Sequence, residues 1–304
     1  MRNSNSSIGG IPTEGKIVNK ASNPASGDFG GQWTRDKLDI IEKYLDAYTT
    51  ALKNQPFKLM YIDAFAGTGE INLLHEDEDA QAFIEGSARR AIKITDKPFD
   101  RLIFVEKDPQ RYARLQALRE ENRSRDIQTE NADANCFLRN LQEDWQSWRG
   151  VLFLDPFATE VEWATIERVA SFNALDTWIL FPVSAIARIL PKSRVPDDIN
   201  NEWAGRLTRI FGDESWRGLY SDSRQQPLWG DVQQERDPGV DGIIRLYKAK
   251  LESLFGKRFM AQSKTFMNST NSPLFEFMFC VGSNNDRAIA LAKRIASHIL
   301  NAST

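Results

Sequence analysis

Cysteine and histidine are scarce in this sequence of 304 residues, which contains two of each. Cys136 and Cys280 both lie in apolar surroundings and lack the spacing of metal ligands, so we predict two buried free thiols in a reducing compartment. Neither His75 nor His298 adjoins a recognisable nucleophile motif. A zinc or other metal site is therefore not expected, and a Ser-His-Asp triad has no support.

Long apolar runs are also absent. No stretch approaches the ~18 consecutive apolar residues of a transmembrane helix, and residues 1–16 lack the apolar segment of a secretory signal. We therefore expect a cytoplasmic protein with no membrane partner. The net charge of −3 and the pI of about 5.7 do not suggest a nonspecific nucleic-acid coat. They still allow a nucleic-acid enzyme, since a local basic face can occur on an acidic protein.

What the sequence does contain is a regular alternation of apolar strands and helices. The expected strands lie at 58–65, 101–108, 126–133, 150–157 and 176–184. The expected helices of the same region lie at 29–54, 86–95, 109–120, 135–145 and 161–171. The first helix is amphipathic, with Thr34 as its predicted N-cap. Alternation of this kind predicts a doubly wound, mostly parallel, Rossmann-like α/β sheet.

The expected domain organisation follows from changes in composition along the chain. Residues 1–28, rich in Ser, Asn and Gly, are predicted to be a disordered tail, and residues 29–184 to form the core. The alternation of strands and helices is interrupted at residues 185–238, and we predict a helical insertion there. Residues 239–304 then complete the core sheet. Their expected elements are helices at 242–255 and 286–300 and strands at 258–267 and 273–283.

The end of the first expected strand runs into a glycine-containing turn, with the sequence Asp-Ala-Phe-Ala-Gly-Thr-Gly at residues 63–69. Such a G-x-G sequence is either an ordinary turn or a place where the backbone lies close to a ligand. As the first strand ends in Asp63, three further strands end in Glu106, Asp133 and Asp155. Each acid alone could be a helix N-cap or a solvated loop residue. Because the carboxyl ends of the strands line the crevice of an open α/β sheet, the four acids together predict one binding pocket.

These motifs resemble those of the class I S-adenosylmethionine-dependent methyltransferases. The resemblance implies that Glu106 binds both ribose hydroxyls of the cofactor and that Asp133 accepts from the adenine amino group. Carboxylates suit both tasks, because hydroxyl and amino groups donate hydrogen bonds. The implied cofactor-binding residues are Asp63, Phe65, Ala66, Gly67, Gly69, Glu106, Lys107, Asp133, Ala134 and Asp155. A dinucleotide enzyme is the alternative, although the third glycine of G-x-G-x-x-G is missing.

Six segments resemble a narrower group, the three-Cys-motif partner protein family, along nearly the full chain that we expect to be ordered. They are FGGQWTRDKL, YIDAFAGTGE, GSARRA, FVEKD, GVLFLDPFATEVEW and WILFPVSAIARIL. Members of this family resemble methyltransferases and are encoded beside a protein that carries a three-cysteine motif. The resemblance therefore names such a neighbour as a candidate partner, and it does not supply a substrate.

Asp155, Pro156 and Phe157 stand where amino-methyltransferases carry D/N-P-P-Y/F. They also resemble the Asp-Pro-Phe-Gly of tRNA guanine-N2 methyltransferases, with Ala158 in place of the glycine. We predict that these three residues are catalytic. A carboxylate that accepts N–H bonds from an exocyclic amine localises the nitrogen lone pair, and Phe157 could stack on a flat base. The alternative is a strand followed by a turn, with Phe157 packed in the core.

Four further residues are weaker candidates for substrate binding: Trp33, Lys37, Ser87 and Arg188. In the competing interpretation, the first helix only packs on the sheet and the charged side chains are solvated. Trp203 and Trp216 of the expected insertion allow either base stacking or core packing.

The function that we favour from the sequence is transfer of a methyl group from S-adenosylmethionine to an exocyclic amine of a nucleic-acid base, with RNA ahead of DNA. Two alternatives stay open. One is a methyltransferase that acts on a small molecule or a protein. The other is a non-catalytic accessory partner of a three-cysteine-motif protein.

Overall fold

The computed structural model describes most of the chain. The described residues are 31–66, 86–156, 158–190, 196–222, 234–236, 239–268 and 270–302. The predicted tail, the two glycines of the G-x-G turn and Phe157 lie outside them.

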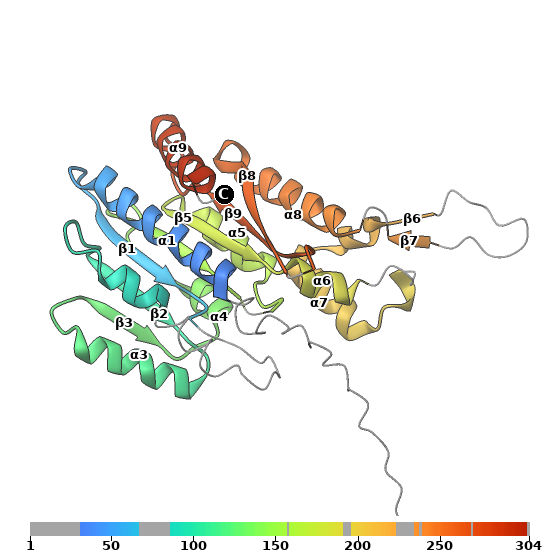
Figure 1. Ribbon diagram of the computed structural model, residues 1–304, viewed down its shortest axis with the longest axis horizontal. Helices are drawn as coiled ribbons and strands as arrows, with labels where there is room; N and C mark the ends of the chain where they lie inside the picture. The colour runs from blue at the N-terminus through green and yellow to red at the C-terminus, as the bar shows by residue number, and fades with distance from the viewer. Residues whose placement is uncertain are drawn as a thin grey trace, which may run out of the picture.

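The centre of the molecule is a sheet of seven strands in the order β3-β2-β1-β4-β5-β9-β8 (Figure 1). The strands are β1 (Lys58–Asp63), β2 (Arg101–Val105), β3 (Ile127–Glu130), β4 (Trp148–Leu154), β5 (Leu175–Phe181), β8 (Phe259–Met267) and β9 (Pro273–Cys280). Neighbours among β1 to β5 pair in parallel, whereas β9 runs antiparallel to both β5 and β8. The predicted mostly parallel α/β fold is therefore confirmed.

Helices cover both faces of the sheet, because the strands present apolar side chains on both sides. Leu59 and Tyr61 of β1 pack in one apolar cluster, and Met60 and Ile62 pack in the other. The first cluster is covered by α1 (Gly31–Leu52), the helical residues 86–92, α3 (Pro109–Glu121) and α9 (Asp286–Ala302). The second cluster is covered by α4 (Ala134–Asn140), α5 (Trp163–Phe172), α6 (Val183–Ile189), α7 (Asn201–Phe211) and α8 (Val240–Phe255).

The region between β5 and α8 holds the expected insertion. Its described part is mostly helical, with α6, α7 and two short 3-10 segments at Pro196–Asp198 and Glu214–Leu219. It also contains a small antiparallel sheet of β6 (Tyr220–Asp222) and β7 (Gln234–Arg236), which the sequence did not indicate. The domain boundaries themselves stay a prediction.

Three local predictions need correction. Thr34 lies inside α1 and is not its N-cap. The helix after β3 ends at Asn140, because Asp144 then organises a turn by accepting from the backbone of Gln146 and from the hydroxyl of Ser147. Cys136 is exposed on the first turn of α4, so only one of the two thiols is buried.

The connectivity of the sheet places a topological switch point between β1 and β4, and we call the carboxyl edge of the strands beside this point the crevice. From β1 the chain passes to β2 and β3 on one side, and it then crosses back to place β4 on the other side of β1. Ligands of open α/β sheets bind outside the carboxyl ends of the strands at this kind of topological switch point. Asp63 ends β1 and Asp155 directly follows β4, so two of the predicted acids flank it. Within the described part of the chain, no helix combines the length and the apolar character needed to cross a bilayer.

Candidate functional site

A buried ion pair lies at the switch point. Lys37 extends from α1, and its Nζ donates to Oδ1 and Oδ2 of Asp155 at 2.8 and 2.9 Å. Both side chains are almost fully buried. The ammonium also lies 4.9 Å from the ring centre of Trp33 and 5.9 Å from that of Phe153. Two predicted residues, 118 positions apart in the chain, are thus joined in one buried group.

A second carboxylate adjoins this pair. Asp63 is 1% exposed, and it receives hydrogen bonds from the hydroxyl of Ser87 and the backbone N–H of Phe65. Its Oδ2 atom is buried and accepts no hydrogen bond of good geometry from the described residues, although the hydroxyl of Tyr61 on the same strand interacts with this carboxylate. Burial raises the pKa of Asp63 to about 7, the charge of Asp155 adds to that rise, and Ser87 and Lys37 oppose it.

The electrostatics of the pair follow from its burial. Removal from water lowers the pKa of Lys37 and raises the pKa of Asp155, while the attraction between the two charges opposes both shifts. Since the ammonium donates to both carboxylate oxygens, we describe the pair as ionised, with Asp63 close to its titration midpoint at neutral pH. Two carboxyl groups beside one ammonium make this a site poised to gain or lose a proton.

Glu106, which follows β2, is the third buried acid of the crevice. Its Oε1 accepts from the backbone N–H of Asp108 at 2.7 Å, and its Oε2 is buried without a hydrogen-bond partner in the described structure. Burial raises the pKa of Glu106 to about 7, against the opposing effects of the Asp108 N–H and of Arg111. A buried carboxylate oxygen without a hydrogen-bond donor lowers the stability of the fold unless a ligand or water donates to it.

The end of β3 supplies the fourth acid in a different setting. Asp133 is exposed and caps α4, with Oδ1 accepting from the backbone N–H of Cys136 at 2.9 Å. Next to it, Asn131 donates from Nδ2 to the backbone oxygens of Glu106 at 2.8 Å and Lys107 at 3.0 Å. Asn131 thereby ties the ends of β2 and β3 together. It escaped the sequence analysis because only acids were considered at strand ends.

The remaining predicted residues divide into those near the crevice and those away from it. Phe65, Ala66 and Ala134 are buried beside it, and the N–H of Ala66 donates to the oxygen of Val105 at 3.0 Å. Lys107 is exposed at the end of β2. Arg188 is exposed on α6 and makes no ion pair within the described part of the chain. The predictions for Gly67, Gly69 and Phe157 lie outside the described residues.

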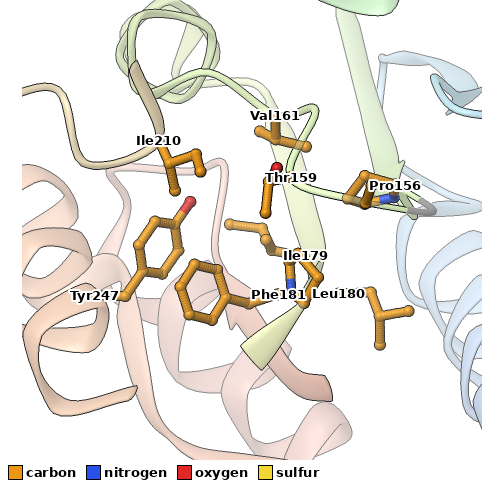
Figure 2. Close-up of a pocket in the computed structure, with 10 residues that line it drawn as sticks. Pro156, Thr159, Val161, Ile179, Leu180, Phe181, Ile210 and Tyr247 are labelled. Atoms are coloured by element: carbon orange, nitrogen blue, oxygen red, sulfur yellow. The ribbon is translucent and has the colours of Figure 1, made fainter. Parts of the chain in front are cut away.

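Pro156 connects the crevice to the insertion. It is buried and lines a narrow, mostly apolar cavity of about 10 Å³, roughly the room that one water needs. Figure 2 shows Pro156 at one end of this cavity and Tyr247 of α8 at the other, with Ile210 of α7 close to the tyrosine. The loop after β4 is therefore packed against both α7 and α8.

A polar pocket of about 260 Å³ adjoins the same loop. Lys107 and Asp133 line it from the ends of β2 and β3, and Arg206 and Arg209 line it from α7. Neither arginine side chain makes a hydrogen bond or ion pair among the described residues. Among those residues, no three histidine, cysteine or acidic side chains gather as a metal site would require.

Comparison with known proteins gives a fold likeness only. No family model and no curated protein matches the chain, so the resemblance to the three-Cys-motif partner family stays a prediction. Protein LPL1258 from Legionella pneumophila str. Philadelphia 1 is 13% identical with a TM-score of 0.44, covering 87% of this chain and 92% of its own. An S-adenosylmethionine-dependent methyltransferase from Clostridium acetobutylicum is 10% identical with a TM-score of 0.34, over 79% and 92% of the two chains.

The bifunctional kinase-methyltransferase WbdD is 14% identical with a TM-score of 0.35, over 82% of this chain and 39% of its own. All of these scores are low, and the case for a function rests on the side chains of the crevice.

Proposed function

We propose that this protein is an S-adenosylmethionine-dependent methyltransferase that methylates an exocyclic amine of a nucleic-acid base, with RNA favoured over DNA. The observation that carries the proposal is a pair of buried carboxylate oxygens, Glu106 Oε2 and Asp63 Oδ2, which lack a well-formed hydrogen bond among the described residues and lie at the ends of adjacent parallel strands. They lie beside the switch point, where ligands of such sheets bind. A ligand with several hydrogen-bond donors would satisfy both.

The cofactor fits these acceptors. Glu106 would accept from the ribose hydroxyls, which are paired donors, and Asp133 from the adenine amino group. Asp63 would face the ammonium of the methionine part, whose charge would compensate the burial of the carboxylate. When bound, the cofactor would supply an electrophilic methyl group on its sulfonium.

Asp155 is the residue that we assign to the chemistry. A carboxylate has about four lone-pair sites, and Lys37 occupies one on each oxygen, so each oxygen can still accept from a substrate amine. Accepting those N–H bonds would localise the nitrogen lone pair that forms the new N–CH₃ bond while the S–CH₃ bond of the cofactor breaks, and the proton released from nitrogen could pass to the carboxylate. Lys37 is a positioning residue: it fixes the Asp155 carboxylate and favours its charged form.

The insertion adds two arginines beside the ends of β2 and β3. Arg206 and Arg209 line the polar pocket with Lys107, and neither arginine side chain forms an ion pair among the described residues, although Asp133, Glu160 and Glu162 line the same pocket. Trp203, 37% exposed, lies one helical turn before Arg206 on α7. Arginines suit phosphate and an exposed indole suits a flat base, which is the combination used for single-stranded nucleic acids.

Calorimetry with S-adenosylmethionine tests the proposal. We expect micromolar binding by the wild type, at least tenfold weaker binding by Glu106→Ala, and unchanged binding by Glu130→Ala, which removes an exposed acid at the end of β3. Transfer of labelled methyl groups to tRNA, rRNA and DNA then tests the acceptor, and Asp155→Ala should abolish it. A folded wild type that gives no heat with the cofactor would rule out the proposed enzyme.

A further inference from the structure

A groove runs between α1 and α9, which lie side by side on one face of the sheet (Figure 1). It consists of two adjoining hollows of about 560 and 620 Å³, and Ile295 lines both. Ala47 and Ala51 line it from α1, and Ala288 and Leu291 line it from α9. The small alanine side chains leave room between the helices, and the floor of the groove is largely apolar.

The exposed charged side chains that line this α1/α9 groove are all positive. Lys43, Arg287 and Arg294 line it, and none of the three makes an ion pair among the described residues. The acid that lines it, Asp176, is buried and already accepts from the hydroxyl of Tyr44 at 2.6 Å and the N–H of Gly282 at 2.7 Å. The groove therefore offers an apolar floor with uncompensated positive charge at its edges.

The dimensions indicate the form of an occupant. On α9 the lining extends from Arg287 to Ala302, which at ~1.5 Å per residue is roughly 22 Å, or about four helical turns. A helix lying between two others buries an apolar stripe at positions i, i+3, i+4 and i+7. Its flanks would then face the cations.

We propose that the α1/α9 groove binds an amphipathic α-helix of a partner protein whose flanking positions are acidic. A second copy of this chain, docked through the same groove, would set Lys43, Arg287 and Arg294 against the same cations. Like charges opposed in this way cost several kcal/mol. Charge complementarity thus selects an acidic partner. This inference does not depend on the proposed methyl transfer.

The test is selection from a displayed library of helical peptides of about 16 residues, the length that spans the groove. The apolar stripe is fixed, and the flanks vary among Glu, Gln and Lys. We expect glutamate-rich peptides to be enriched and to bind the wild type with a Kd in the micromolar range by fluorescence anisotropy. The variant Leu291→Glu should weaken this binding at least tenfold.

Charge reversal supplies the decisive comparison. Arg287→Glu/Arg294→Glu should reverse the selection toward lysine-rich peptides, whereas Arg245→Glu, on exposed α8 surface across the sheet, should leave it unchanged. Enrichment of no peptide, or of peptides without a charge preference, would overturn the proposal. So would a wild-type dimer in sedimentation equilibrium that Leu291→Glu dissociates, since the groove would then be an interface between two copies.

Discussion

At the scale of residues, the stability of the site depends on the buried ion pair of Lys37 and Asp155. Taking both charges out of water is expensive, and their mutual attraction offsets this cost only while both are present. The pair is also held by its surroundings, since the ammonium lies over the ring of Trp33 and near the carboxylate of Asp63. Removing one member would leave the other as an uncompensated charge.

We therefore predict that Lys37→Met lowers the free energy of unfolding by about 3 kcal/mol or more. The double variant Lys37→Met/Asp155→Leu should recover at least half of that loss, because no buried charge is left without its partner. Urea unfolding of the two single variants and the double variant gives the coupling energy. Lys53→Met, at an exposed position just after α1, should change little. Strictly additive losses would contradict the pairing.

The structure places the predicted acids Asp63, Glu106 and Asp155 at the ends of strands, and it adds contacts between distant residues that the sequence did not indicate. Acids at strand ends can be recognised, because a strand that runs into Asp63, Glu106 or Asp155 leaves a polar group at the edge of the sheet. The contact between Lys37 and Asp155 joins elements far apart in the chain, and no local pattern encodes it. Whether these residues bind a cofactor stays a prediction, which the calorimetry described above would test.

At the scale of elements, burial decided which predictions succeeded. The strands β4 and β5 are almost wholly buried along their length, so their continuous apolar runs identified them. Helix ends were harder, as the early end of α4 shows, because side chains such as Asp144 compete for the backbone after the helix. The position of α7 over the loop after β4 depends on tertiary contacts, and amino-acid composition alone does not predict such contacts.

One of these contacts can be tested at Gly212, which ends α7 with φ at +81°. A Cβ there would lie 2.2 Å from Trp163 of α5. Gly256 combines φ of 54° with ψ of −129°, a conformation that glycine alone adopts readily, whereas Gly218 has neither a positive φ nor a nearby atom. We expect Gly212→Ala and Gly256→Ala each to destabilise the fold by ~2–3 kcal/mol, the first through contact with Trp163 and the second through backbone strain, and Gly218→Ala to cost less than ~0.5 kcal/mol.

Thermal and urea unfolding of the three variants would establish this order. A loss at Gly212 as small as that at Gly218 would mean that Trp163 moves aside without cost, and that α7 is held to α5 by other contacts.

At the scale of the whole molecule, the alternation of strands and helices was enough to predict a mostly parallel α/β sheet. It could not predict that burial would raise the pKa values of three carboxyl groups well above their usual range. Burial raises the pKa of Asp63 and of Glu106 to about 7 and that of Asp176 to about 6. Two lie in the proposed cofactor site, and Asp176 lies at the opposite, amino-terminal edge of the sheet.

These shifts predict how stability depends on pH. Each folded-state pKa lies above its unfolded value, so between about pH 4 and pH 7 the folded chain binds more protons than the unfolded chain. The stabilisation is complete below the unfolded pKa values and is lost as the pH rises through the folded ones. We expect the free energy of unfolding to fall by ~2–4 kcal/mol between about pH 5.5 and pH 8. Asp213, whose pKa is lowered to about 2 by Lys250 and Ser215, titrates below this window.

The change Asp63→Asn tests which groups cause the pH dependence of the free energy of unfolding, because it replaces one titrating carboxyl with a neutral group of the same shape. Its stability relative to that of the wild type should increase from about pH 4 and level off above about pH 7, with a flatter profile in urea unfolding across the window. Asp241→Asn, at an exposed position on the first turn of α8, should retain the wild-type slope. A wild-type stability that is constant or increases from pH 5.5 to pH 8 would contradict this prediction. It would show that the buried carboxyl groups are ionised in the folded protein, because water or a nearby positive charge stabilises the carboxylates in place of bulk solvent.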